Sequence, residues 1–191
     1  MKLPIPGYIQ DIRSNCESID DAIAIILKEC KITKPPINVI QIATNMGFSV
    51  YDAEFKDNKI VGVIADMHEP IKPFGKKRII ATKRGDYPTR KLFTIAHEIG
   101  HFVMHCGEAN DYFERDIDED ELFDTRDDTE CAADKFAACL LMPKDMFIDY
   151  VRKSPYYLLD KEALIQDIQK MFVVSYTAAK LRLNEVDLNW Q

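Results

Sequence analysis

The stretch His97-Glu98-Ile99-Gly100-His101 decides how this sequence is interpreted, because it combines two imidazoles and a carboxylate at helical spacing. On an α-helix, residues four apart lie one above the other, about 6 Å along the axis, so both imidazoles can bind one metal ion. Glu98 lies about 100° around the helix from His97, where a carboxylate can act as a general base. The stretch matches the H-E-x-x-H zinc motif, and the alternative is two core histidines on an ordinary helix.

The residues on both sides of this motif predict the helix that it needs. Asp86 or Thr89 can cap the start, Pro88 suits the first turn, and Gly107 can end the helix. Gly100 lowers helix propensity by about 1 kcal/mol relative to alanine, which indicates that another backbone passes close to it. An apolar stripe recurs at spacings of three and four residues, through Leu92, Phe93, Ala96, Ile99, Gly100 and Val103. We therefore expect the metal to lie where a core helix meets a cleft.

A catalytic zinc site needs three protein ligands and an open fourth position, so the two histidines require a third ligand. Glu130 is the best candidate, because it begins a second helical pattern, residues 130–142, which Pro143 ends. His105 is the alternative, since it lies one turn after the second histidine. Three histidines at successive four-residue intervals span about 12 Å on a straight helix, which is too far for one ion, so the geometry favours Glu130.

Asp134 lies one turn after Glu130 on the same helical face. A histidine that binds zinc normally donates its other ring N–H to a carboxylate, which fixes the tautomer and raises the basicity of the ring. We therefore expect Asp134 to accept a hydrogen bond from His97.

Three stretches together carry a family resemblance: HEIGH at 97–101, EcaADkFAacLLMP at 130–143 and MFVVSYTAAKLRL at 171–183. Between about residues 36 and 188 the chain resembles the ImmA/IrrE family of zinc metallopeptidases, which is similar to the thermolysin-like zincins. The resemblance implies His97, His101 and Glu130 as Zn²⁺ ligands and Glu98 as the catalytic acid and base. It also implies a protein substrate, a helix-turn-helix repressor, whose cleavage releases genes of mobile elements, phages or stress responses. We expect no room for an added DNA-binding domain before residue 36.

The periodicities predict a helix-rich α+β fold of zincin type. Residues 48–55, 60–65 and 78–82 are expected to form a small three-stranded antiparallel sheet, with the first two strands paired as a hairpin. An exposed edge at residues 60–65 could bind an extended peptide as an added strand. We expect an N-terminal amphipathic helix segment (1–34), a metallopeptidase core (35–150) and a C-terminal helical subdomain packed on the core (151–191).

Composition agrees with a compact cytoplasmic enzyme. The chain has 191 residues, 47% of them hydrophobic, and neither a signal peptide nor a membrane-spanning run is expected. Its five cysteines lack C-x-x-C spacing and are expected to be reduced, with Cys131 buried in its helix. The net charge of −7 argues against a broad nucleic-acid surface. The acidic run 116–130 is typical of a solvated loop, and the alternative is a lid over the cleft.

The C-terminal region leaves a competing function open. The apolar pattern from Leu164 to Leu183 predicts a helix, a turn and a second helix, with Lys170, Lys180 and Arg182 nearby. This segment is interpreted as a helical hairpin that supports the active site, and the alternative is a DNA-reading unit. A further alternative is an antirepressor that binds its repressor without cutting it.

Overall fold

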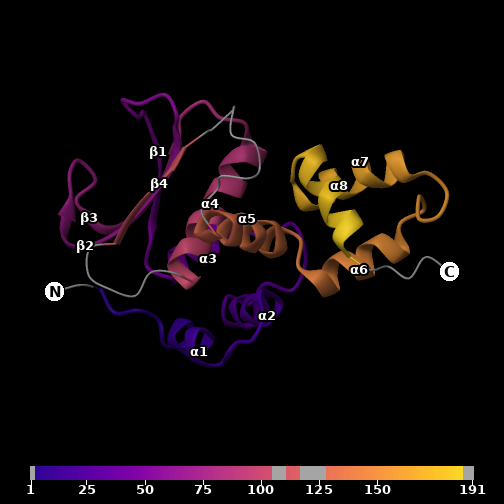
Figure 1. Ribbon diagram of the computed structural model, residues 1–191, viewed down its shortest axis with the longest axis horizontal. Helices are drawn as coiled ribbons and strands as arrows, with labels where there is room; N and C mark the ends of the chain where they lie inside the picture. Colours follow the sequence, from indigo (N-terminus) through magenta and orange to yellow (C-terminus); the bar gives the residue numbers. More distant parts are fainter. Residues whose placement is uncertain (1–2, 105–110, 117–127, 187–191) are drawn as a thin grey trace.

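The computed structural model describes residues 3–104, 111–116 and 128–186, and these form an α+β fold (Figure 1). A sheet lies on one side of the molecule, α4 and α5 lie beside it, and α6, α7 and α8 lie beyond these two helices (Figure 1). The elements in chain order are α1 (Gly7–Asn15), α2 (Ile19–Glu29), α3 (Val39–Asn45), β1 (Ser49–Ala53), β2 (Ile60–Ile71), β3 (Lys76–Lys83), α4 (Pro88–Met104), β4 (Asp111–Asp116), α5 (Asp128–Leu141), α6 (Lys144–Lys153), α7 (Lys161–Phe172) and α8 (Tyr176–Glu185). The predicted α+β class and the C-terminal helical hairpin, α7 with α8, are confirmed.

The sheet has four strands in the order β1-β3-β2-β4 and is mixed rather than purely antiparallel. β1 runs parallel to β3, with Val50 opposite Ile80, whereas β2 runs antiparallel to both β3 and β4. The predicted hairpin between the first two strands is therefore wrong, because β2 forms its hairpin with β3. The tight turn of that hairpin contains Gly75, whose φ of +65° suits a residue without a side chain.

The fourth strand also corrects the expectation of a free edge at residues 60–65. These residues belong to β2, which pairs on one side with β3 and on the other with β4, so they are interior to the sheet. Their side chains are accordingly buried from Val61 to Ala65. No strand was predicted at Asp111–Asp116, because this segment lacks the apolar alternation that marks a strand.

Local capping explains where several helices begin. Ser18 caps α2: its hydroxyl accepts a hydrogen bond from the Asp21 backbone N–H at 3.1 Å and donates one to the Asp21 carboxylate at 2.6 Å. The side chain of Asn38 caps α3 by accepting from the Gln41 backbone N–H. Pro88 occupies the first position of α4, as predicted. No helix in the described ranges combines the length and the apolar character needed to cross a bilayer.

The buried apolar residues form one cluster that reaches from Ile9 in α1 to Val186 after α8. It includes residues from the N-terminal helices, from α4 and α5, and from the C-terminal hairpin. The division of the chain at residues 34 and 150 stays a prediction.

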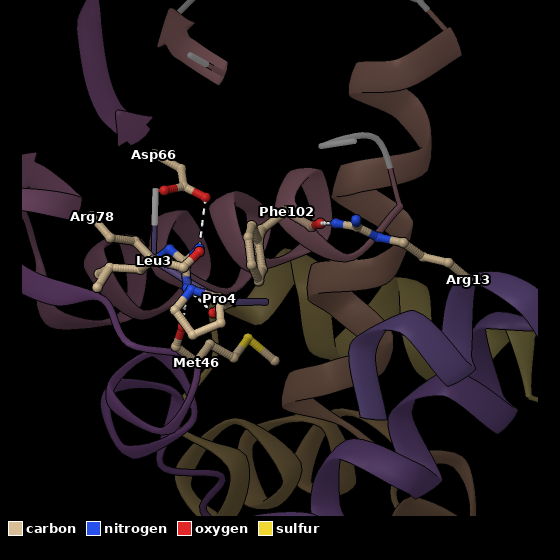
Figure 2. A network of polar contacts seen from close by, with 7 residues as sticks. All are labelled: Leu3, Pro4, Arg13, Met46, Asp66, Arg78 and Phe102. Carbon is tan, nitrogen blue, oxygen red and sulfur yellow. Dashed lines mark hydrogen bonds and ion pairs between the residues drawn. The ribbon is translucent and has the colours of Figure 1, made fainter. Parts of the chain in front are cut away.

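The buried side chain of Arg78 ties the N-terminal segment to the sheet (Figure 2). Arg78 of β3 is 2% exposed and donates to the carboxylate of Asp66 at 2.8 Å. The same guanidinium donates to the backbone carbonyls of Met46 at 2.9 Å and Leu3 at 3.1 Å. It also lies 5.1 Å from the ring centroid of Phe102, the residue that follows His101. The charge of Arg78 is thus compensated next to the last turn of α4.

Arg13 of α1 contacts the end of α4 directly. Its guanidinium donates to the carbonyl oxygens of Phe102 and, at 3.0 Å, of Val103 (Figure 2 shows the first of these contacts). Carbonyls in the last turn of a helix have no partner within the helix, so a cation placed there satisfies them and interacts favourably with the helix dipole. The helix that carries the H-E-x-x-H motif is therefore held at its C-terminal end by α1.

Candidate metal centre

The helix α4 presents the motif residues from inside the molecule rather than from its surface. Its apolar stripe packs into the core, with Ile95, Ala96, Ile99 and Phe102 all buried. His97 and His101 are each 1% exposed and Glu98 is 0% exposed. Three buried polar side chains within five residues are costly unless each has a role or a partner, so this segment is not an ordinary core helix.

Glu130 of α5 meets the two histidines. Its Oε1 lies 2.9 Å from His101 Nε2 and its Oε2 lies 3.1 Å from His97 Nε2. The two Nε2 atoms are themselves 2.9 Å apart. The structure thus brings together the three side chains that were selected from the sequence, from two helices separated by more than twenty residues, as one group able to hold a metal ion.

The donor set fits a catalytic zinc ion. Two imidazole nitrogens and one carboxylate oxygen are a known combination of protein ligands for such an ion. Ligand atoms around a tetrahedral zinc lie about 3.3 Å from one another, since each bond is about 2.0 to 2.1 Å long. The observed separations of 2.9 to 3.1 Å differ from this by only a few tenths of an ångström. Small side-chain rotations would therefore be enough to accommodate the ion.

Asp134 contacts the ring nitrogen of His97 that faces away from this group. The Asp134 Oδ1 and His97 Nδ1 atoms are 2.8 Å apart. An ionised carboxylate only accepts hydrogen bonds, so this contact favours the tautomer in which Nδ1 carries the proton. The lone pair of Nε2 is then available for a metal ion, as expected from the position of Asp134 one turn after Glu130.

Electrostatics within the group favour an ionised Glu130. Burial by itself raises the pKa of this carboxyl, but hydrogen bonds with His101 and His97 outweigh burial and hold the pKa well below its usual range. Glu130 is therefore a carboxylate at neutral pH, which is the form that binds a cation.

Glu98 points to the sheet side of α4, against β2. A Cβ atom added to Gly62 would lie 2.8 Å from Glu98 Oε1 and 2.3 Å from the Thr94 methyl carbon. The absence of a side chain at Gly62 therefore leaves the space that the Glu98 carboxylate occupies. Gly62 was not among the residues selected from the sequence, although a glycine within an apolar strand is a known sign of close approach.

Gly100 allows α4 and α5 to approach closely. A Cβ atom at Gly100 would lie 3.1 Å from Cδ1 and 3.2 Å from Cβ of Phe136. A close approach at this position was predicted, but the neighbour is an aromatic side chain of α5 rather than another backbone. This contact sets the distance between the helix that carries the histidines and the helix that carries Glu130.

Several expectations need correction or lie outside the described residues. His105, the alternative third ligand, and most of the acidic run, residues 117–127, lie outside them. Cys131 is exposed rather than buried, because it lies on the outer face of α5. All four cysteines in the described part of the chain have free thiols, as expected; these are Cys16, Cys30, Cys131 and Cys139.

A solved structure of a Mycobacterium tuberculosis transcriptional regulator resembles the fold with a TM-score of 0.52 and 16% sequence identity. The match covers 93% of this chain and 49% of the regulator, so the chain spans about half the length of that structure. At this identity the likeness shows the fold alone. No curated protein sequence matches the chain significantly.

The model of the Peptidase M78 family, described as the IrrE N-terminal-like domain, matches residues 43–184. This range includes α4, α5 and most of the C-terminal hairpin, and with them every residue of the candidate metal centre. The chain belongs to the Peptidase M78 family of IrrE N-terminal-like domains.

Proposed function

We propose that this protein is a zinc-dependent endopeptidase that cuts a helix-turn-helix transcriptional repressor, acting as an antirepressor in the cytoplasm. The observation that supports the proposal best is the convergence of His97, His101 and Glu130, with Glu98 beside them on the same helix as the histidines. Membership of a peptidase family supports a protein substrate. The likeness to a protein described as a transcriptional regulator supports a role in gene regulation.

In the proposed mechanism, His97, His101 and Glu130 hold the ion and Asp134 fixes the tautomer of His97. A bound zinc ion would supply a Lewis acid that lowers the pKa of water towards about 7 and offsets negative charge on the scissile carbonyl. Glu98 accepts the proton of the attacking water and later donates it to the leaving amine. Burial strengthens each of these interactions, because Glu98 and both histidines are shielded from bulk water.

The test is to incubate the purified protein with repressors encoded beside its gene, with and without a chelator, and to identify products by mass spectrometry. We expect cleavage that requires metal and that is abolished in Glu98→Gln while zinc is retained. If Glu98→Gln instead relieves repression as well as the wild type does, the protein acts by binding and not by proteolysis. If the purified wild-type protein contains no zinc, the proposal of zinc-dependent catalysis is wrong.

A further inference from the structure

An apolar groove of about 720 Å³ lies between the N-terminal half of α4, the helix α5 and the start of α8. Phe93 of α4, Ala138 and Leu141 of α5, and Ala178 of α8 line it. A concave, mainly apolar surface of this size is typical of a ligand site. The groove lies outside the group of metal ligands, and of its lining residues only Asp134 has a part in the mechanism above.

The groove continues from the candidate metal centre. Asp134, whose carboxylate contacts His97 at 2.8 Å, also lines the groove. Phe93 lies one turn before His97 on α4, and Ala138 lies one turn after Asp134 on α5. The apolar lining of the groove therefore begins one helical turn from His97 on α4 and two turns from Glu130 on α5, next to the residues proposed to hold the ion.

Two large apolar side chains at the rim remain in solvent. Tyr87, immediately before α4, is 76% exposed, and Leu181 of α8 is 56% exposed. Both line the groove. Exposed apolar groups that flank a concave apolar surface gain free energy when a partner covers them.

The charges around the groove favour an apolar partner over nucleic acid. Arg90, Lys135 and Arg182 line it together with the acidic residues Asp134 and Glu185. Mixed charges of this kind do not make the clustered positive surface that phosphate binding needs. In a helix-turn-helix interpretation α8 would be the helix that reads bases, but its apolar side chains line the groove instead.

We propose that this groove binds a hydrophobic segment of the polypeptide substrate next to the scissile bond, and that Leu181 and Tyr87 determine this specificity. The inference rests on the proposed peptidase function, since it assigns the groove to the substrate of that reaction. Covering one substrate side chain of leucine or phenylalanine size with the rim residues should make binding roughly tenfold tighter than with a polar side chain at the same position.

The experiment measures peptide binding without cleavage. Full-length, zinc-loaded protein with Glu98→Gln is immobilised and exposed to a mixture of randomised decapeptides, and bound peptides are sequenced by mass spectrometry. We expect roughly tenfold enrichment of leucine, isoleucine, methionine and phenylalanine at one position. Adding Leu181→Asp should remove this enrichment, whereas Leu181→Met should keep it.

The matched control is Leu159→Asp, because Leu159 is an 83% exposed leucine that does not line the groove. This variant should keep the enrichment, and all variants should hold equal zinc. Absence of enrichment in the Glu98→Gln protein, or its persistence in Leu181→Asp, would overturn the inference. This readout measures binding and needs no cleavage. A wild-type protein without peptidase activity would therefore refute the proposed function, while the measured peptide preference of the groove would remain valid.

Discussion

Gly62 of β2 lies directly against the carboxylate of Glu98, so close that a Cβ atom at this position would come within 2.8 Å of Glu98 Oε1. The same Cβ would lie 2.3 Å from the Thr94 methyl carbon. Thr94 and Glu98 are both buried, at 1% and 0% exposure, so neither side chain can turn outward into solvent to make room. The position of the proposed general base thus depends on a residue without a side chain in a central strand.

Gly62→Ala should lower peptidase activity while zinc binding is kept. Displacement of a catalytic group by about 1 Å costs on the order of 100-fold in rate, and overpacking costs about 1 to 3 kcal/mol of stability. Steady-state cleavage rates, zinc content and thermal unfolding would measure these effects. Gly7→Ala is the matched control, because a Cβ atom there has no neighbour within 4 Å. Full activity of Gly62→Ala would show that Glu98 is not positioned in this way.

Asp134→Asn should weaken zinc binding by roughly 10 to 100-fold, since the amide no longer provides a charged acceptor for His97 Nδ1. Competition with a chelator of known affinity would measure the change. Asp145→Asn is the control, because it makes the same substitution at an exposed position of α6. Equal zinc affinity in Asp134→Asn and the wild type would show that the 2.8 Å contact does not support the ligand.

Asp66→Ala should destabilise the fold by about 3 kcal/mol or more, because it leaves the buried charge of Arg78 without its carboxylate. Denaturation in urea would measure the free energy of unfolding. Glu54→Ala is the matched control: Glu54 also pairs with an arginine, Arg84, but the two side chains are 77% and 62% exposed. An exposed pair contributes at most about 1 kcal/mol. A loss in Asp66→Ala no larger than in Glu54→Ala would contradict this account of the network.

Metal removal should lower the melting temperature. An ion at a hundredfold excess over its Kd stabilises the folded state by about 2.7 kcal/mol, which corresponds to roughly 5 to 10 °C for a chain of this size. His97→Ala should abolish the response to chelator, and Cys131→Ser should keep it, because the thiol is no ligand in this scheme. A chelator response unchanged in His97→Ala would place the ion elsewhere.

The helices of the site can be predicted because their signals are local. The four-residue spacings of His97 with His101 and of Glu130 with Asp134 fix which side chains share a helical face, whatever the tertiary fold. Pro88 and Pro143 indicate where the first helix begins and where the second ends. With both helices in place, a metal group of two histidines and one glutamate follows from the number of ligands that zinc needs.

The sheet is harder to predict, because strand pairing is not local. Nothing in the residues of β1 and β3 themselves indicates that these two strands pair in parallel, with β2 between them in the chain. The strand Asp111–Asp116 is held by its backbone pairing with β2. Its mainly polar sequence lacks the apolar alternation from which a strand can be predicted. Gly62 and the groove beside Asp134 depend on contacts between β2, α4, α5 and α8, which arise only after these elements have packed together.

The central claim is that His97, His101 and Glu130 bind one catalytic ion, and X-ray absorption spectroscopy of the zinc-loaded protein tests it most directly. The account predicts one zinc ion per chain, with two imidazole nitrogens and at least one carboxylate oxygen in its coordination shell, and loss of this site in Glu130→Ala. Wild-type protein that binds no zinc, or a spectrum unchanged in Glu130→Ala, would contradict the account.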